Sequence, residues 1–579
     1  AQWAPVRICL VTPFAWSLPH DVNEHVAGAA SGLRALGHDV TVIAPSTRAA
    51  ELQAGRRALQ RGELPPVLAL GTAVPVSRSS TVALPVGVRA SLGHALRIGR
   101  FDVVHGFEPG LRSLSFAALT EAETLTVATF LSPERVGRVQ RRAARDRLRA
   151  RVDALLATSS GTAEAAAVEF PGEYHLVPAG VDVERFRPAA KRQLVVAQLE
   201  VSGRQLVRSA LRALDELAGW EMICLHTKPL GVRPSIPVRL RGRVSVRAAR
   251  AEETRAAILA EAAVFVPVPG GHTRLRLEAQ AAGCAIVDPP GSDQQPELVA
   301  AALARLGSDT AHREAEATRS RRAAEAESFE RLAAELDRTY ASIARRRRAR
   351  KPSDPLAHRD WILVDLHMHT SASHDCSIDP IDLVEHAASI GLGAIAVTDH
   401  NVFDGALAAV DAAHGSDLIV IPGEEMKTDD QGEVIGLFLR ERIPKGLSFA
   451  ETIDAVREQE GIVYLPHPFD RRHAIPDPAT LHRHLADIDV LEVYNARLLK
   501  EAYNDEALRF ARKYGLLQGA GSDAHVLPGV GTGVLRMRRF DGPEEFLLSL
   551  RTSEVLRRPK SLAYLQSLKW VAQVKEKVL

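Results

Sequence analysis

The sequence predicts an α/β protein with two doubly wound, Rossmann-like halves followed by a barrel-like α/β region. Short apolar runs alternate with helical patterns along most of the chain, which is typical of parallel βαβ units. This alternation restarts twice, near residues 193 and 361, and 579 residues exceed the usual size of one domain. We therefore expect domains at 1–190, 191–345 and 361–579, with a linker at 346–360.

Short apolar segments give the expected strands of the first two regions. In residues 1–190 they lie at 7–12, 37–43, 101–105, 125–129 and 154–157, and a helix is expected over 22–36. In residues 191–345 they lie at 193–197, 221–225, 264–267 and 285–287, and a long helical stretch follows over 311–350. Runs of this kind predict two parallel sheets with helices on both faces.

A basic run ends that helical stretch, because six of the seven residues 345–351 are Arg or Lys. Cations at the carboxyl end of a helix are favoured by the helix dipole, so a solvated helix end is the simpler interpretation. A nucleic-acid site is the alternative, but no aromatic residues are interleaved for base stacking. We expect no stable nucleic-acid complex.

Composition narrows the class of protein. The chain is 46% hydrophobic and 25% charged, which is typical of a folded protein, and its net charge of +2 gives no general attraction to nucleic acids or membranes. The four cysteines show no CxxC spacing, and no apolar run approaches the roughly 18 residues of a membrane span. The sequence thus indicates a cytoplasmic protein without a transmembrane segment.

Histidines concentrate in the C-terminal region. Twelve of the 21 lie in the 228 residues after Lys351, about twice the density of the preceding part. Strands are expected there at 362–366, 394–397, 418–421, 434–439, 462–465, 490–493 and 516–520. Seven βα repeats suggest a barrel-like domain, in which residues that carry chemistry lie at the carboxyl ends of the strands.

Candidate metal ligands follow almost every one of these strands. They are His367, His369, Asp375, Asp399, His400, Glu424, Glu425, His467, Glu492, Asp523 and His525. A single buried histidine is more often a hydrogen-bonded core residue than a ligand, but so many carboxylates at one rim repel one another unless cations are bound. Because the donors are nitrogen and oxygen without thiolate, the expected ions are Mn, Zn or Fe.

These residues stand in motifs that resemble those of the PHP (polymerase and histidinol phosphatase) family. The motifs are DLHMHT at 365–370, TDHN at 398–401, PGEE at 422–425, PHPFD at 466–470 and GSDAH at 521–525. The resemblance covers residues 361–534. It implies a distorted seven-stranded β/α barrel holding two or three divalent ions that hydrolyse phosphoesters.

The resemblance also implies roles for single residues. The expected ligands of a first ion are His367, His369, Glu425 and Asp523. A second ion is expected on Glu425 and His467, and a third on Asp375, His400 and His525. Glu433 stands where the family has a histidine, so the second site is expected to be Glu-substituted. Glu492 is either a further ligand or a group that supports one.

The expected reaction is attack of a metal-activated hydroxide on a phosphoester. Two cations polarise the phosphoryl oxygens and lower the pKa of a bridging water. Among the expected catalytic residues, Asp523 and His525 manage the protons and Asp399 orients an imidazole. The candidates for binding substrate phosphate are Arg471, Asn495 and Arg497. For the two arginines an ordinary surface position is an equal alternative.

Residues 1–345 are similar to family 4 glycosyltransferases of the GT-B fold, especially the phosphatidylinositol mannosyltransferase type. The similarity rests on segments that include 12–16, 37–40, 101–105, 127–130 and 177–182. The family's functional positions differ. A phosphate-loop glycine pair is replaced by the segment with Asp21, a catalytic histidine by Leu131, the pyrophosphate-binding Arg and Lys by Gln198 and Gly203, and one of two glutamates by Gly270, with Glu278 retained.

Loss of the Arg and Lys removes charge-assisted hydrogen bonds of about 1.5–3 kcal/mol each. We therefore expect a metal-dependent phosphoesterase whose inactive transferase-like half serves substrate binding or assembly, with homo-oligomer formation as one such role. The expected substrate is a phosphorylated small molecule, sugar, lipid or oligonucleotide. Two alternatives stay open: a bifunctional transferase and phosphoesterase, and a non-catalytic metal-binding scaffold. Residues 561–579 look amphipathic and are expected to pack on their own domain, with an interfacial membrane helix as the alternative.

Overall fold

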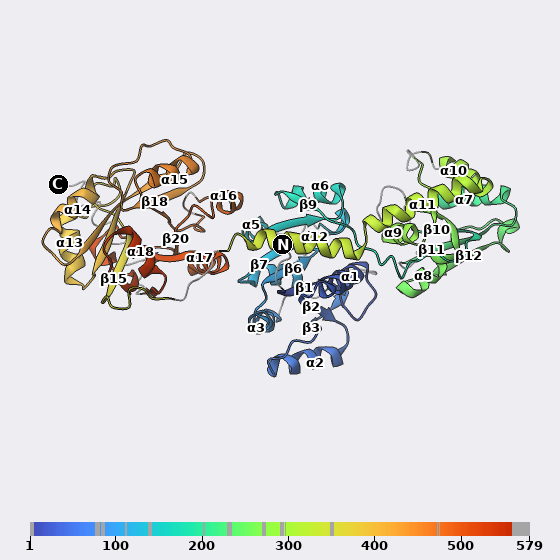
Figure 1. The fold of residues 1–579 in the computed structure, drawn as a ribbon, viewed down its shortest axis with the longest axis horizontal. Coiled ribbons are helices and arrows are strands. Elements are labelled where there is room, and N and C mark those ends of the chain that lie inside the picture. Colours follow the sequence, from blue (N-terminus) through green and yellow to red (C-terminus); the bar gives the residue numbers. More distant parts are fainter. Residues whose placement is uncertain are drawn as a thin grey trace. The chain divides into compact units, whose positions relative to one another are not determined.

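The structure is a computed structural model that describes residues 5–75, 81–82, 87–110, 113–136, 142–200, 203–227, 234–268, 274–289, 295, 297–347, 353–471, 473 and 475–557. It divides into two compact units, Ala1–Ile343 and Ala344–Leu579, and each is considered by itself (Figure 1). The amphipathic segment 561–579 and residues 348–351 of the basic run lie outside the described residues.

The first unit begins with a parallel sheet of seven strands. Their order is β3 (Val67–Thr72), β2 (Asp39–Ser46), β1 (Arg7–Val11), β6 (Val103–Phe107), β7 (Leu125–Phe130), β8 (Ala154–Ala157) and β9 (Tyr174–Leu176). The helices between them are α1 (Asp21–Ala35), α2 (Ala49–Gln60), α3 (Arg89–Gly99), α4 (Leu114–Glu121), α5 (Arg142–Arg151) and α6 (Ser160–Glu169), and β4 (Val74–Pro75) pairs with β5 (Thr81–Val82). Every residue of β6 and β7 is buried, as expected for central strands covered on both faces.

A second parallel sheet follows, with five strands. Their order is β12 (Val244–Ala248), β11 (Glu221–His226), β10 (Arg192–Gln198), β13 (Ala262–Val266) and β14 (Ala285–Ile286). The accompanying helices are α7 (Arg204–Glu216), α8 (Glu252–Glu261), α9 (Arg274–Ala281) and α10 (Glu297–Ser308). The buried residues Leu206, Ala210 and Leu214 recur every fourth position of α7 and face the core of this sheet.

The long helix expected over 311–350 is wrong as one element. It is two helices, α11 (Thr310–Ala326) and α12 (Phe329–Ala344). The break has a physical cause: the backbone N–H of Val181 donates to Glu327 O at 3.0 Å, and the N–H of Phe329 donates to Val181 O at 3.2 Å, in place of helical hydrogen bonds. The phenol of Tyr340 on α12 lies 2.7 Å from the imidazole of His105 on β6, which ties α12 to the first sheet.

The second unit is built on one mixed sheet of nine strands. Their order is β21 (Leu517–Gly521), β20 (Val490–Asn495), β19 (Ile462–Leu465), β18 (Glu433–Leu437), β17 (Ile419–Lys427), β16 (Ala394–His400), β15 (Trp361–Met368), β22 (Gly533–Arg538) and β23 (Glu554–Arg557). The helices are α13 (Pro380–Ser389), α14 (Asp404–Ala412), α15 (Phe449–Glu458), α16 (Pro478–Arg483), α17 (Glu501–Tyr514) and α18 (Gly542–Leu550). Helices α13 and α14 lie side by side (Figure 1).

This sheet departs from a series of βα repeats. Strand β18 is antiparallel to both β17 and β19 and follows β17 directly through a short turn, so no helix separates them. Strands β22 and β23 were not among the strands predicted from the sequence, and they extend the sheet beside β15. The chain after β21 returns to β15 through a parallel bridge between Met368 and Ala524, which brings the two ends of the seven-strand series together.

Asp365 fastens this junction. Its fully buried carboxylate accepts hydrogen bonds from the backbone N–H groups of Ser522 and Gly531, each at 2.9 Å. Burial raises the pKa of Asp365 to about 6, although these donors favour the charged form. The carboxylate therefore links β15 to the segment that carries the GSDAH motif.

We predict that Asp365→Asn lowers the free energy of unfolding by about 1–3 kcal/mol. An asparagine amide has one oxygen, so it can accept from the backbone N–H of Ser522 or of Gly531, and its NH₂ group then faces the other N–H, which is left without an acceptor. Urea denaturation of the full chain measures this change. Asp382→Asn, on the exposed face of α13, is the matched control. Equal unfolding free energies for the two variants would contradict the role given to Asp365.

Candidate metal centre

Strand directions bring the candidate ligands to one rim of the second unit. β16 and β17 are parallel, and His400 at the end of β16 pairs in register with Glu425 of β17. Because β18 runs the other way, its first residue, Glu433, reaches the same rim opposite Lys427. Four further side chains come from the carboxyl-end segments of β15, β19 and β21: His369, His467, Asp523 and His525. The sheet thus positions residues that lie far apart in the sequence.

Glu425 is the centre of the cluster. One carboxylate oxygen, Oε1, lies 3.1 Å from Nε2 of His467. The other, Oε2, lies 3.2 Å from Nε2 of His367, 3.2 Å from Nδ1 of His400 and 3.5 Å from Nε2 of His369. Burial alone raises the pKa of Glu425, but the surrounding imidazoles outweigh it and hold that pKa well below its usual value. Glu425 is therefore an anion facing four histidines.

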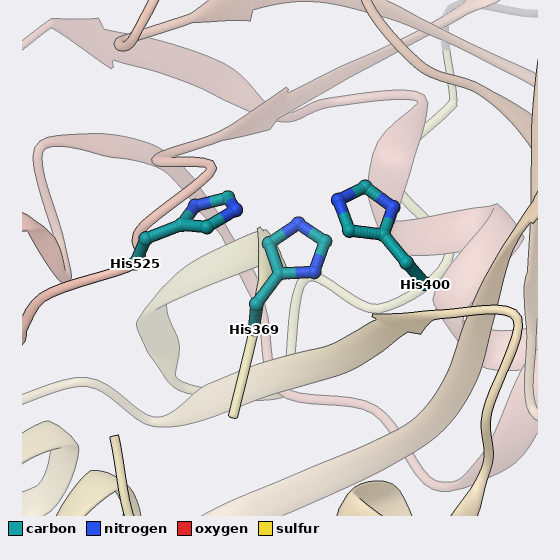
Figure 2. Close-up of side chains that lie close together, drawn as sticks. All are labelled: His369, His400 and His525. Atoms are coloured by element: carbon teal, nitrogen blue, oxygen red, sulfur yellow. The ribbon is translucent and has the colours of Figure 1, made fainter. Parts of the chain in front are cut away.

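Three imidazoles form one side of the cluster. Figure 2 shows the ring of His369 between those of His525 and His400, and its centroid lies 4.4 Å from each. Asp375 joins this group, with Oδ2 2.9 Å from Nε2 of His525 and Oδ1 3.9 Å from Nε2 of His400. Burial and the neighbouring histidines lower the pKa of His369 to about 3, so its ring is neutral. A neutral imidazole has the lone pair that metal coordination needs.

The other side of the cluster is more acidic. Oε2 of Glu433 lies 3.8 Å from Nε2 of His467, and one oxygen of Glu433 lies within 4.8 Å of donor atoms of both His400 and Glu425. Burial, and then the charge of Glu425, raise the pKa of Glu433 to about 7. Two carboxylates with two histidines between them thus share this side.

Asp523 connects the cluster to the loop after β21. Its Oδ1 lies 3.5 Å from both Nε2 of His369 and Nδ1 of His525. Burial raises its pKa, but Arg497 and His367 outweigh this effect and hold the pKa of Asp523 well below its usual value. Asp523 and His467 both have positive φ angles, 51° and 25°, which side-chain-bearing residues rarely adopt. Such backbone conformations concentrate at functional sites.

The residues present fit divalent cations. Nε2 of His369 and Oε2 of Glu433 are buried and make no hydrogen bond within the described residues, so coordinating atoms are available. Groups of donor atoms within 4.8 Å of one another include His367 with His369 and Glu425, and His367 with His467 and Asp523. Mixed imidazole and carboxylate donors without thiolate suit Mn, Zn or Fe.

Two expected site residues support the cluster rather than enter these donor groups. Glu492 lies 3.0 Å from Nδ1 of His367 and accepts a hydrogen bond from Tyr464 at 3.1 Å, so Nε2 of His367 is the atom that faces Glu425. Asp399 accepts hydrogen bonds from Thr370 and Ser373, and within the described residues it accepts none from an imidazole nitrogen. Its effect on the histidines passes through Ser373, whose Oγ lies 3.5 Å from Nδ1 of His369.

The three expected phosphate-binding residues lie in different settings. Arg497 donates to Oδ1 of Asp523 at 3.1 Å, and the same nitrogen lies 3.0 Å from Nδ1 of His525, so one cation stands at the edge of the cluster. Asn495 is buried and donates to Glu492 and Asp523 at 3.1 and 3.3 Å, which makes it a positioning residue. Arg471 is exposed, in the loop after His467.

Sequence reasoning missed several supporting residues. Tyr464, on β19, looks like a core residue, yet its hydroxyl donates to Glu492. Asn504, on α17, donates to the backbone of Asn495 and accepts from it. His473 stacks on the ring of His467 with centroids 4.4 Å apart. Of these three, only His473 could have been found from the sequence, because it lies six residues after His467 of the PHPFD motif.

In the first unit, charges that the sequence singled out are paired within the chain. Asp21 accepts a hydrogen bond from Arg135 at 2.6 Å. Glu278, fully buried, accepts two from Arg255 at 2.7 and 2.8 Å, and Arg274 lies 3.3 Å from it. Gly203 precedes α7, Gln198 donates to Glu200 and Leu131 donates its N–H to Glu108, whereas Gly270 lies outside the described residues.

Comparison with known families gives three matches along the chain. The model of Glycosyltransferase Family 4 matches residues 22–185, the model of the PHP domain matches residues 365–507, and a PHP-associated model matches residues 501–555. The two units therefore match different families.

Curated relatives each match a part of the chain. An uncharacterized protein of Methanocaldococcus jannaschii is 37% identical over 212 residues, which are 34% of this chain and 84% of the relative. A phosphatidyl-myo-inositol mannosyltransferase of Propionibacterium freudenreichii is 33% identical over 171 residues, which are 28% of this chain and 42% of that enzyme. The match thus spans less than half the length of the mannosyltransferase.

Solved structures resemble the chain only distantly. A candidate metal-dependent phosphoesterase from Bifidobacterium adolescentis has 20% identity and a TM-score of 0.25, covering 28% of this chain and 87% of that one. A glycosyltransferase from Rickettsia africae has 12% identity and a TM-score of 0.41, covering 59% of this chain and 99% of that one.

No helix in the described residues has the length and apolar character of a membrane span. The second unit carries a PHP domain with a PHP-associated segment, and residues 22–185 match the model of Glycosyltransferase Family 4.

Proposed function

We propose that the protein is a metal-dependent phosphoesterase whose chemistry takes place at the rim of the second unit. One observation carries the proposal: the buried Glu425 lies at the centre of four imidazoles, with Asp523 and Glu433 beside them. Burying so many ionisable groups together costs free energy unless their charges are compensated, and divalent cations coordinated by these imidazoles and carboxylates would compensate them. The proposed fold of this unit is a distorted seven-stranded β/α barrel extended by β22 and β23.

Two or three ions, Mn, Zn or Fe, are proposed on three sets of residues. The sets are His367, His369, Glu425 and Asp523; Glu425, Glu433 and His467; and Asp375, His400 and His525. When bound, such ions act as Lewis acids that polarise a phosphoryl oxygen and lower the pKa of a coordinated water. The substrate is proposed to be a phosphorylated small molecule, sugar, lipid or oligonucleotide.

The chain's own residues supply binding and orientation. Arg497 lies at the edge of the cluster with about a quarter of its side chain exposed, so its guanidinium can hold a phosphoryl oxygen. His525 and Asp523, which it contacts, are the proposed groups for moving protons. Glu492 holds His367, while Asp399 fixes the turn of Thr370 and Ser373 beside His369.

For the first unit we propose a non-catalytic role in substrate binding or assembly, including self-association. Glu278 is the glutamate that the family's pattern retains, and both of its oxygens are bonded by Arg255, with Arg274 beside it. Arg255 and Arg274 also donate to Glu24 at 2.8 Å. These arginines are already neutralised within the chain, so a sugar nucleotide's diphosphate would have to displace buried ion pairs.

Replacing His367 and His369 together by alanine is expected to reduce hydrolysis by on the order of a hundredfold or more, because the donor groups around Glu425 lose two imidazoles. The assay uses the full chain with Mn²⁺ or Zn²⁺ and two probes, p-nitrophenyl phosphate and a short oligonucleotide. Chelation of the wild-type chain is expected to give the same loss.

His414→Ala, which removes an exposed histidine of the same unit, controls for general effects and is expected to keep full activity. Undiminished hydrolysis by the double variant would rule out the proposed site. Tightly bound metal without hydrolysis of any phosphoester in a broad panel would favour the scaffold alternative.

Arg497→Gln is expected to raise KM for a phosphomonoester about tenfold at saturating metal, because a cation that contacts the phosphate is lost. Arg497→Lys restores part of the charge but not the fork geometry, so its KM falls between the two. Steady-state kinetics measure both, with the exposed Arg551→Gln as control. A KM that is equal in wild type and Arg497→Gln would remove Arg497 from the substrate site.

Calorimetric titration of the full chain with uridine and guanosine diphosphate sugars tests the first unit. We expect no saturable heat at millimolar ligand, because the arginines near Glu278 are held in ion pairs. Saturable binding of either ligand would contradict the non-catalytic role and favour the bifunctional alternative.

A further inference from the structure

We propose that the rim of the second unit holds two chemically different cation sites, one selective for Zn²⁺ or Fe²⁺ and one selective for Mn²⁺, and that Glu433 sets the difference. The imidazole subsite consists of the proposed third set, Asp375, His400 and His525, together with His369, whose ring lies between those of His400 and His525. The carboxylate subsite consists of Glu425, Glu433 and His467. This inference rests on the proposed metal-dependent function and adds to it which ion each side of the cluster prefers.

Imidazole nitrogens predominate in the imidazole subsite, where Asp375 adds one carboxylate, 2.9 Å from Nε2 of His525. The ring centroid of His369 lies 4.4 Å from those of His400 and His525, and nitrogen atoms from all three rings lie within 4.8 Å of one another (Figure 2). Nε2 of His369 is buried and makes no hydrogen bond to any residue that the structure describes. Three imidazole donors favour the later transition metals, of which Zn²⁺ and Fe²⁺ are the common examples.

The carboxylate subsite has the opposite character. Glu425 contributes Oε1, 3.1 Å from Nε2 of His467, and Glu433 contributes Oε2, 3.8 Å from the same nitrogen. Oε2 of Glu433 is buried and accepts no hydrogen bond from the described part of the chain. His400 also lies within 4.8 Å of Glu425 and Glu433, so it stands between the two subsites. Two carboxylates with these imidazoles still form a harder and more negative donor set than the imidazole subsite, which suits Mn²⁺ better than it suits Zn²⁺.

The backbone fixes Glu433 in this place. The preceding Gly432 has a φ of 94°, and a Cβ there would lie 2.9 Å from Ile475 and Pro476, so the turn into β18 admits glycine alone. Thr428 closes the turn, with its N–H and its hydroxyl both donating to Gly432 O at 2.9 Å. Glu433 is then paired in register with Lys427 of β17. Its carboxylate is therefore presented to the cluster by rigid elements.

The decisive variant is Glu433→His, which exchanges a hard oxygen donor for an imidazole at the same position. Glu433→Asp is the conservative variant that keeps the carboxylate. Glu441→Gln is the control, because Glu441 is an exposed carboxylate in the loop after β18.

The full-length proteins are stripped of metal, equilibrated with equal Mn²⁺ and Zn²⁺, and analysed for metal per chain by mass spectrometry. Electron paramagnetic resonance of bound Mn²⁺ gives a second readout that is independent of activity. We expect wild type, Glu433→Asp and Glu441→Gln to carry both metals, and Glu433→His to lower the Mn-to-Zn ratio by on the order of tenfold or more.

Three outcomes would overturn the inference. An unchanged Mn-to-Zn ratio in Glu433→His removes the role of Glu433 while leaving the proposed phosphoesterase intact. Zinc alone on the wild type shows that the two subsites do not differ. No bound metal on the wild type contradicts the proposed function together with this inference. Thermal melts of all four proteins identify a variant that is unfolded, and Glu433→Asp then tests the position in its place.

Discussion

The burial of Glu425 is the constraint on which the rest of the second unit depends. A carboxylate that is 1% exposed is stable as an anion only if positive or polar groups surround it, and here four imidazoles do so. Those imidazoles come from the ends of different strands, so the sheet must bring its ends together. The hydrogen bonds from Ser522 and Gly531 to Asp365, together with the bridge between Met368 and Ala524, hold these ends together. Site and fold are thus consequences of one electrostatic requirement.

The two units meet the same requirement in different ways. In the first unit, Glu24 and Glu278 are bonded by Arg255 and Arg274, so the buried charges balance within the chain. In the cluster around Glu425, several carboxylates face one fixed cation: Arg497 is the one arginine or lysine among the described residues that contacts Asp523. The other groups that face these carboxylates are imidazoles, whose charge depends on their surroundings. A balanced network suits a scaffold, and an unbalanced one suits the binding of cations.

Much of this arrangement could be predicted from the sequence. Buried parallel strands such as β6 and β16 appear as continuous apolar runs, and parallel strands present their carboxyl ends at one edge, so side chains such as His400 were expected near Glu425. The approach of Glu433 was expected only through family resemblance. Its physical cause, the reversal of β18, depends on the turn at Gly432 and on pairing with β19, which local sequence does not encode.

Other features required the tertiary structure. The break between α11 and α12 depends on Val181, which lies far away in the sequence and takes up the local backbone hydrogen bonds. The orientations of Asp399 and Glu492 likewise depend on partners such as Ser373 and Tyr464, whose residue types occur in any core or turn. Strands β22 and β23 follow the last recognisable motif and carry no site residue, so nothing in the pattern of ligands pointed to them.

The central claim is that the cluster around Glu425 exists to hold cations. Anomalous diffraction from crystals of the full chain grown with Mn²⁺ and Zn²⁺, with data collected on both sides of each absorption edge, tests it most directly. The account predicts anomalous peaks among Glu425, His369 and His467, with manganese on the side of Glu433 and zinc on the side of His525. Well-ordered side chains with no anomalous peak among them would contradict the account.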